Sequence, residues 1–261
     1  MTLTFDAMAS QFDDQRGLPR AAISAWLRCV DELAAGRQLH VIEPGIGTGR
    51  IALPLAIAGH VVAGVDISPP MLDVCRQRAE TLGVADLVDA IWGDAADLPY
   101  AEHSFDLGVI AQLLYLVPDW TTVLDELARV VSPGGYVIHL TEPTIESDAL
   151  QLWSSTWWQM VAETGYQQLE VKPGEDDIAA EFLRRWPDVQ VQELASWEFG
   201  QTVAEARRDY GRRVRVVYPD MAQEVWDALV DRYLAWSESA FPDSSTMLSG
   251  RVVLTARIAA S

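Results

Sequence analysis

The stretch HVIEPGIGTGRIALPLAIAGHVVAGVDIS, residues 40–68, decides the fold. It begins with an apolar run that ends at Glu43, and Gly45, Gly47 and Gly49 follow, each separated by one residue. A short helical pattern and a second apolar run come next. Glycines in a tight turn between a strand and a helix let the backbone approach a ligand closely. The stretch therefore predicts a strand, a nucleotide-binding turn, a helix and a second strand.

The same alternation of strand and helix patterns continues to residue 140. Apolar runs that predict strands occur at 39–43, 60–67, 87–94, 105–112 and 134–140. Amphipathic stretches of helical length separate these runs, and parallel strands need such crossover connections. We expect a Rossmann-like, doubly wound α/β sheet, mostly parallel.

The regular alternation of strand and helix patterns ends after residue 141. Helices are predicted at 146–165, at 175–186 and twice within 201–241, and strands at 189–199 and 250–260. The predicted segments are an N-terminal helical segment (1–37), a core (38–140), a mostly helical insertion with one returning strand (141–248) and a closing strand (249–261).

Composition limits the partners of this chain of 261 residues. Its formal charge of −19 is spread over both halves, so its surface repels phosphate backbones and anionic membranes. The two cysteines, Cys29 and Cys75, lie in helical patterns and form neither a disulfide framework nor a metal motif. No apolar run has the length of a membrane span, and the N-terminus lacks the features of a targeting segment. We expect a cytoplasmic protein without metal, nucleic acid or membrane span, and a homodimer stays open.

Glycine spacing separates the nucleotide chemistries. A dinucleotide fingerprint, G-x-G-x-x-G, needs its third glycine where this chain has Arg50. A Walker A loop needs G-K-[ST], which is absent here. The spacing therefore weakens an NAD or FAD site and argues more strongly against a phosphate-binding loop.

VIEPGIGTGR resembles motif I of the class I S-adenosylmethionine-dependent methyltransferases. The resemblance implies that the glycine turn and Glu43 face the amino acid part of that cofactor. S-adenosylmethionine has a sulfonium and an ammonium but no phosphate, so a carboxylate beside the turn is favourable. The resemblance further implies that Asp66 binds the ribose hydroxyls, that Asp94 in GDAADLPY binds the adenine amino group, and that the backbone N–H of Ala95 contacts the ring.

The resemblance covers residues 38–140 and includes SFDLGVIAQLLYLVPDWTTVLDELARVVSPGGYVI, similar to the fourth strand, helix and turn of small-molecule members. It implies seven strands in the order 3-2-1-4-5-7-6, with strand 7 antiparallel. FDAMASQFDDQRG, near the N-terminus, resembles the lid helix of ubiquinone and menaquinone biosynthesis C-methyltransferases. This implies that Phe12 or Arg16 contacts the cofactor, and that the segments 1–37 and 141–248 cover a small-molecule acceptor.

Further candidates surround the expected cofactor. Ile67 and Met71 either border the adenosine or belong to the core. In the family the segment after the fourth strand faces the methyl group, which makes Gln112, Leu113 and Tyr115 candidates by position. Tyr115, His139 and Glu142 are alternatives for a base, if the acceptor must lose a proton, and the catalytic residue stays unknown.

Two clusters after residue 140 each have two interpretations. Trp153, Trp157 and Trp158 form either an aromatic wall for a planar acceptor or a small helical core. An arginine group either binds a substrate carboxylate or forms a solvated helix face. This group consists of Arg207, Arg208, Arg212, Arg213 and Arg215.

The sequence thus predicts transfer of a methyl group from S-adenosylmethionine to a small molecule by in-line displacement. An NAD-dependent oxidoreductase and a non-catalytic S-adenosylmethionine-binding protein are the alternatives.

Overall fold

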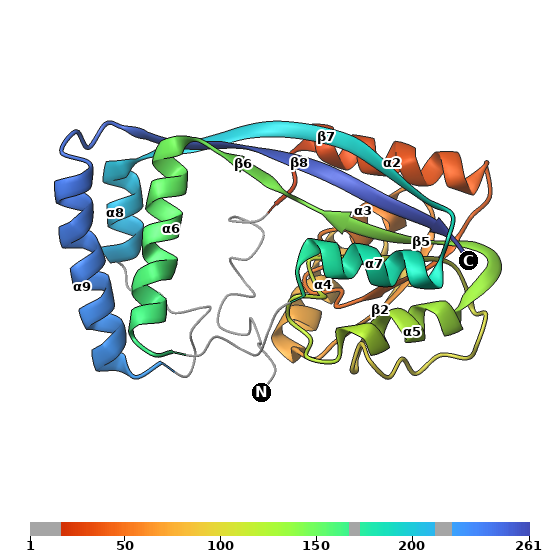
Figure 1. The fold of residues 1–261 in the computed structure, drawn as a ribbon. Coiled ribbons are helices and arrows are strands. Elements are labelled where there is room, and N and C mark those ends of the chain that lie inside the picture. The colour runs from red at the N-terminus through yellow and green to blue at the C-terminus, as the bar shows by residue number, and fades with distance from the viewer. Residues whose placement is uncertain (1–16, 167–172, 212–220) are drawn as a thin grey trace. The chain divides into compact units, whose positions relative to one another are not determined.

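The computed structural model describes residues 17–166, 173–211 and 221–261. The chain divides into two compact units (Figure 1). Unit 1 comprises residues 1–142, 171–195 and 254–261, and unit 2 comprises residues 143–170 and 196–253.

Five parallel strands form the sheet of unit 1. They are β1 (His40–Pro44), β2 (Val61–Asp66), β3 (Val88–Trp92), β4 (Phe105–Ala111) and β5 (Val131–Thr141). Their order is β3-β2-β1-β4-β5, and β8 (Met247–Ala260) pairs antiparallel with β5. Val41, Ile42 and Leu107 are fully buried, as expected of parallel strands that are covered on both faces. The predicted α/β sheet is confirmed.

The sequence did not predict β6 (Thr144–Glu146), which contains three residues. β6 pairs antiparallel with residues 250–252 of β8 in the register of the β5–β8 ladder, and therefore continues that ladder. β7 (Val189–Thr202) also pairs with β8. The sheet has eight strands rather than seven, and the predicted order holds if β6 is treated as an extension of β5.

The helices of unit 1 follow their sequence signals. They are α2 (Arg20–Ala34), α3 (Ala52–Ile57), α4 (Pro69–Thr81), the 3₁₀ turn η2 (Ala85–Leu87), α5 (Trp120–Val130) and α7 (Glu175–Arg185). Ser68 caps α4, because its hydroxyl accepts a hydrogen bond from the backbone N–H of Met71 at 3.4 Å. The apolar stripe of α5, with Leu124 and Leu127, is buried. Ile178 and Phe182 of α7 belong to the same core cluster as this stripe.

Unit 2 contains α6 (Asp148–Glu163), α8 (Val203–Gly211) and α9 (Gln223–Ala240), which lie side by side in Figure 1. Trp153 and Trp157 are buried in the core of these helices, whereas Trp158 is 47% exposed. The core interpretation therefore holds for the first two tryptophans.

The described arginines of the predicted group have structural contacts within unit 2. Arg207 donates hydrogen bonds to the backbone oxygens of Ser237 and Phe241 at 2.6 and 2.9 Å, and so satisfies carbonyls at the end of α9. Arg208 lies 3.9 Å from Glu205 in an exposed ion pair. Arg212, Arg213 and Arg215 lie outside the described residues.

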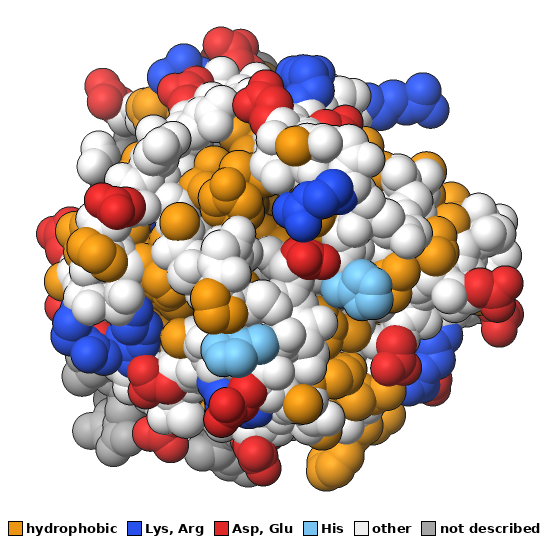
Figure 2. Space-filling model, turned by 90° about the vertical axis from the view of Figure 1, so that its right-hand side faces the viewer, with side chains coloured by type: hydrophobic (Ala, Val, Ile, Leu, Met, Phe, Trp, Pro, Cys, Tyr) orange, Lys and Arg blue, Asp and Glu red, His pale blue; other side chains and the backbone are white. Residues whose placement is uncertain are grey.

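Charged side chains are scattered over the face shown in Figure 2 rather than gathered into one patch. In the part of the chain that the structure describes, no helix is long and apolar enough to cross a membrane. The same residues contain no group of three or more His, Cys, Asp or Glu side chains that could hold a metal ion.

Candidate cofactor site

A cavity of about 290 Å³ lies in unit 1, next to the carboxyl ends of β1, β2 and β4. Ligands of open α/β sheets bind at this edge. The predicted site residues that line it are Glu43, Gly45, Gly47, Asp66, Ile67, Met71, Asp94, Ala95 and Gln112. Phe12 and Arg16 lie outside the described residues. Residues from four separate stretches of sequence thus meet in one cavity.

The glycine turn is held against β2. The backbone N–H groups of Gly45 and Ile46 both donate to the carbonyl of Val65, at 2.7 and 3.0 Å. Gly45 and Gly47 have φ angles of +71° and +54°, in the left-handed region that glycine adopts without steric cost. The turn therefore brings backbone rather than side chains to the cavity.

Gly49 has a different position and does not line the cavity. A Cβ atom at this residue would lie 2.6 Å from Leu53 Cγ and 2.9 Å from Cys75 Sγ. Gly49 lets α3 and α4 pack against the turn, so its contribution in the structure is to packing.

Asp66 joins the glycine turn to the start of α4. One carboxylate oxygen accepts a hydrogen bond from the N–H of Gly47 at 2.9 Å, and the other accepts one from the N–H of Ser68 at 2.9 Å. The position at the end of β2 was predicted, but these two backbone contacts were not. A carboxylate has about four lone-pair sites, and Asp66 lines the cavity.

Glu43 is a buried carboxyl group in the cavity wall, with 3% of its surface exposed. It accepts a hydrogen bond from the backbone N–H of Ala52, while its Oε2 atom has no hydrogen-bond partner among the described residues. Burial raises its pKa to about 8; Asp66 adds to the rise, and Arg50 and the Ala52 hydrogen bond oppose it. A cation beside Oε2 would supply the missing partner and favour the ionised form.

Another group of lining residues is apolar or lies in turns. Met71 is buried at the start of α4, and Ile67 lies two residues before the first residue of that helix. Asp94 is exposed after β3, and its Oδ1 accepts a hydrogen bond from the N–H of Ala96 at 2.9 Å. Ala95, between them, is buried. These residues form an apolar surface with an acidic rim.

The end of β4 closes another side of the cavity. Gln112 has a φ angle of +54°, a strained conformation for a residue other than glycine. Leu113 also lines the cavity, and a Cβ atom on Gly45 would lie 2.7 Å from its Cδ1 atom. Gln112 directly follows β4, at the strand end that the family resemblance associates with the methyl group.

None of the three candidate bases, Tyr115, His139 and Glu142, is among the described residues that line the cavity. Burial, and next Glu175, raise the pKa of Tyr115 to about 12. Burial and Arg257 lower the pKa of His139 to about 3. Glu142 accepts a hydrogen bond from Arg50 at 2.7 Å.

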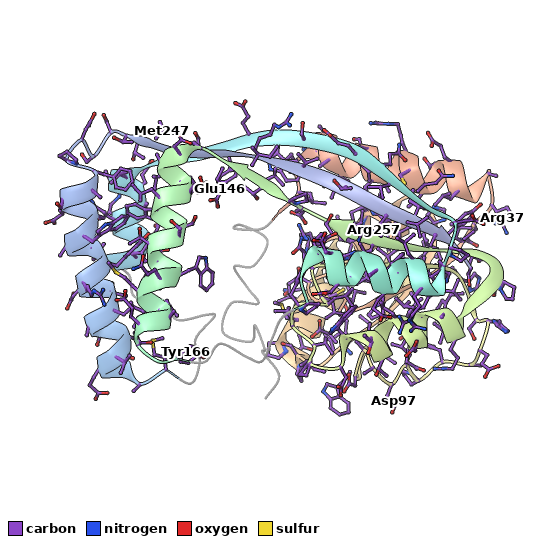
Figure 3. The ribbon with its side chains drawn as sticks, in the orientation of Figure 1. Arg37, Asp97, Glu146, Tyr166, Met247 and Arg257 are labelled. Carbon is purple, nitrogen blue, oxygen red and sulfur yellow. The ribbon has the colours of Figure 1, made fainter. Side chains whose placement is uncertain are left out.

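Arg257 on β8, labelled in Figure 3, was not predicted. Its Nη1 atom lies 2.9 Å from His139 Nδ1, and its Nη2 atom donates to Glu175 at 2.7 Å. An arginine can only donate, so His139 accepts through Nδ1 and carries its proton on Nε2. This arrangement keeps His139 neutral and removes Nδ1 as a proton acceptor.

Sequence reasoning missed several other lining residues. Ile46, Thr48 and Arg50 belong to the quoted stretch, and Ser68 is its last residue. Leu116, Val117, Pro118 and Asp119 belong to the segment after the fourth strand that was expected to face the methyl group, but none of them was named as a candidate. Their adjacency to predicted residues was the available signal.

The comparisons with known proteins identify methyltransferases as similar to this chain. A family model described as "Methyltransferase domain" matches residues 42–139. A demethylmenaquinone methyltransferase from Thermus thermophilus is 32% identical over 161 residues, which cover 60% of this chain and 72% of that protein. One from Oceanobacillus iheyensis is 41% identical over 105 residues, which cover 39% of this chain and 43% of that protein.

A solved structure, the YcgJ protein from Bacillus subtilis, shares the fold. The TM-score is 0.59 at 17% sequence identity, and the alignment covers 91% of this chain and 99% of that chain. The family model and the Thermus thermophilus relative, together with the shared fold, define a class I S-adenosylmethionine-dependent methyltransferase. The chain belongs to this family, with S-adenosylmethionine as its methyl donor and a small molecule as its acceptor. The NAD-dependent oxidoreductase and the non-catalytic protein are not favoured.

Proposed function

We propose that the cavity of unit 1 binds S-adenosylmethionine and that the chain transfers its methyl group to a small organic acceptor at the end of β4. The observation that carries this proposal is the buried Glu43 carboxyl group, whose Oε2 atom has no hydrogen-bond partner among the described residues. A buried polar atom without a partner is costly, and the ammonium of the cofactor would satisfy it.

The other lining residues fit the remaining parts of the cofactor. Asp66 would accept the ribose hydroxyl groups, and Asp94 with the N–H of Ala95 would bind the adenine. Ile67 and Met71 supply apolar contacts to the adenosine, which suits a planar base. Gly45 and Gly47 would let the methionine part approach the backbone.

When bound, the cofactor supplies an electrophilic methyl group on its sulfonium. The protein then has to orient the acceptor in line with that group and to exclude water. Gln112 and Leu113 lie at the end of β4 and would position the acceptor there. The neutral His139 and the high pKa of Tyr115 favour an acceptor that already carries a reactive lone pair or an acidic proton.

The names of the relatives make demethylmenaquinone the first acceptor to test. We also propose that residues 1–37 and 141–248 contribute the lid, with Phe12 and Arg16 as cofactor contacts. A cytoplasmic location is supported by Cys29 and Cys75, which are buried free thiols. A homodimer stays a prediction, which light scattering of the purified protein would test.

The function is tested by calorimetric titration with S-adenosylmethionine, S-adenosylhomocysteine and NADH in parallel, followed by an acceptor screen read by mass spectrometry. We expect micromolar binding of the first two ligands and methyl transfer to at least one acceptor. Binding of NADH alone would support the oxidoreductase instead. Cofactor binding without transfer to any acceptor would support a non-catalytic protein.

A further inference from the structure

Arg50 and Glu142 form an ion pair at the edge of the cavity. Arg50 Nη2 lies 2.7 Å from Glu142 Oε1, and the two side chains are only 13% and 20% exposed. Arg50 lines the cavity and Glu142 does not. The pair therefore presents its cationic member to the cofactor site.

The topology explains why residues 92 positions apart meet. Arg50 follows the glycine turn after β1, and Glu142 directly follows β5. β4 lies between these two strands in the sheet. The ion pair thus spans the carboxyl end of β4, where Gln112 and Leu113 line the same cavity.

The charges of the cavity make Arg50 distinctive. The ionisable residues among the described lining are four acids and Arg50, the acids being Glu43, Asp66, Asp94 and Asp119. The amino acid part of S-adenosylmethionine carries an α-carboxylate beside its ammonium. A carboxylate among four acids would be repelled unless a cation faced it.

We propose that Arg50 binds the α-carboxylate of the cofactor and that Glu142 is a positioning residue that holds the Arg50 guanidinium in place. This inference rests on the proposed function of the cavity. Glu43 would bind the ammonium and Arg50 the carboxylate, so the two side chains recognise the zwitterion from both of its ends. A guanidinium suits this task because its planar fork of donors can serve two carboxylates at once.

Glu142 then has a positioning role in place of the role of a base. The Glu142 carboxylate accepts a hydrogen bond from Arg50, so it is oriented toward that guanidinium rather than toward the methyl acceptor. Its removal should therefore weaken cofactor binding without removing a proton acceptor from the reaction.

The first experiment compares three nucleosides on the folded full-length protein by calorimetry. They are S-adenosylhomocysteine, its decarboxylated analogue, which keeps the ammonium, and 5′-methylthioadenosine, which lacks the whole amino acid part. We expect Arg50→Gln to weaken S-adenosylhomocysteine binding by roughly 10- to 100-fold and to leave the other two affinities within about twofold. An equal loss for S-adenosylhomocysteine and the decarboxylated analogue would overturn the proposal.

Two variants control for charge and for folding. Arg232→Gln removes an arginine from an exposed ion pair with Glu163 in unit 2 and should not change the three affinities. Arg50→Lys keeps the charge but not the planar fork, and should recover part of the S-adenosylhomocysteine affinity. If Arg50→Gln does not fold, Arg50→Lys must still weaken S-adenosylhomocysteine more than the decarboxylated analogue, and an equal effect contradicts the assignment.

The second experiment separates positioning by Glu142 from general-base catalysis. We expect Glu142→Gln to raise the KM for S-adenosylmethionine roughly 3- to 10-fold at a nearly unchanged kcat and pH profile. Glu142→Asp should recover part of this loss. A fall in kcat with the loss of one limb of the pH profile would identify Glu142 as a base and refute its positioning role.

The outcomes also separate this inference from the proposed function. If the wild-type protein binds none of the three nucleosides, the proposed function fails. If it binds all three with equal affinity, the cofactor site stands and the carboxylate assignment to Arg50 fails.

Discussion

The two units of the molecule differ in whether their buried polar groups have hydrogen-bond partners. Among the described residues, the buried side-chain atoms without a hydrogen-bond partner are Glu43 Oε2, His60 Nε2, Tyr100 Oη and His139 Nε2, all in unit 1. In the core of unit 2, the Tyr233 hydroxyl donates to the Trp153 carbonyl at 2.5 Å.

This difference separates a binding unit from an aromatic scaffold. Buried polar atoms without partners lower stability, so their presence at a cavity wall indicates a ligand. One of these atoms, Oε2, belongs to Glu43, which lines the cavity. Unit 2 instead stabilises itself through packed rings, such as Trp157 and Tyr233, whose centroids lie 4.9 Å apart.

The largest effect on stability is expected from the aromatic core. Trp157→Ala should destabilise unit 2 by about 3–5 kcal/mol, because it leaves a cavity among packed rings. Chemical denaturation combined with hydrogen exchange of α9 measures this loss. The matched control is Trp158→Ala, at a residue 47% exposed, which should cost much less. Equal losses for the two variants would refute the core assignment.

The next effect concerns the binding unit. Asp66→Ala should weaken S-adenosylhomocysteine binding about 100-fold, because it removes the expected ribose acceptor and the anchors of Gly47 and Ser68. Calorimetry measures the affinity. Asp73→Ala, which removes a carboxylate 77% exposed on α4, is the control and should bind normally. Normal binding by Asp66→Ala would remove Asp66 from the site.

The raised pKa of Glu43 predicts a pH dependence of stability in the cofactor-free protein. The folded pKa of about 8 lies above the ordinary carboxyl value of 4.5, so the stability contribution is complete below pH 4.5 and is lost as pH rises through 8. Between pH 6 and pH 7 the free energy of unfolding should fall by about 1.4 kcal/mol through this group. Urea unfolding at both pH values, compared with Glu43→Gln, isolates the effect. A slope that Glu43→Gln retains would assign it to other groups.

The smallest expected effect is the difference in stability between two tyrosine variants, one from each unit. Tyr233→Phe should cost about 1 kcal/mol, because the hydrogen bond from its hydroxyl to the Trp153 carbonyl is lost. Tyr100→Phe should be neutral or stabilising, since the hydroxyl it removes is buried without a partner among the described residues. Thermal unfolding of both variants measures the difference. The reverse order would contradict the contrast between the units.

Local patterns predicted most of the fold. The β-branched runs and the glycine turn predicted the strands from 40 to 141, because fully buried parallel strands are continuously apolar. β6 was missed because a strand of three residues has no detectable period, and its pairing depends on β8, more than 100 residues later.

The site residues at strand ends were predictable, whereas the contacts between side chains far apart in the sequence were not. Glu43 and Asp66 lie at the carboxyl ends of β1 and β2, and Asp94 follows β3, so their meeting at one edge of a parallel sheet follows from topology. The contact of Arg50 with Glu142 and that of His139 with Arg257 join distant residues through side-chain geometry. No spacing rule encodes these contacts, and the second of them contributes, after burial, to the lowered pKa of His139.

The most direct test is the number of protons released when S-adenosylhomocysteine binds at pH 7, obtained by calorimetry in buffers of different ionisation enthalpy. If the cofactor ammonium pairs with Glu43, binding ionises a carboxyl group that is protonated in the free protein. The wild-type protein should then release about one proton and bind more tightly as pH rises toward 8, whereas Glu43→Gln should release none. Equal proton release by the two proteins would contradict the assignment of Glu43 to the cofactor ammonium.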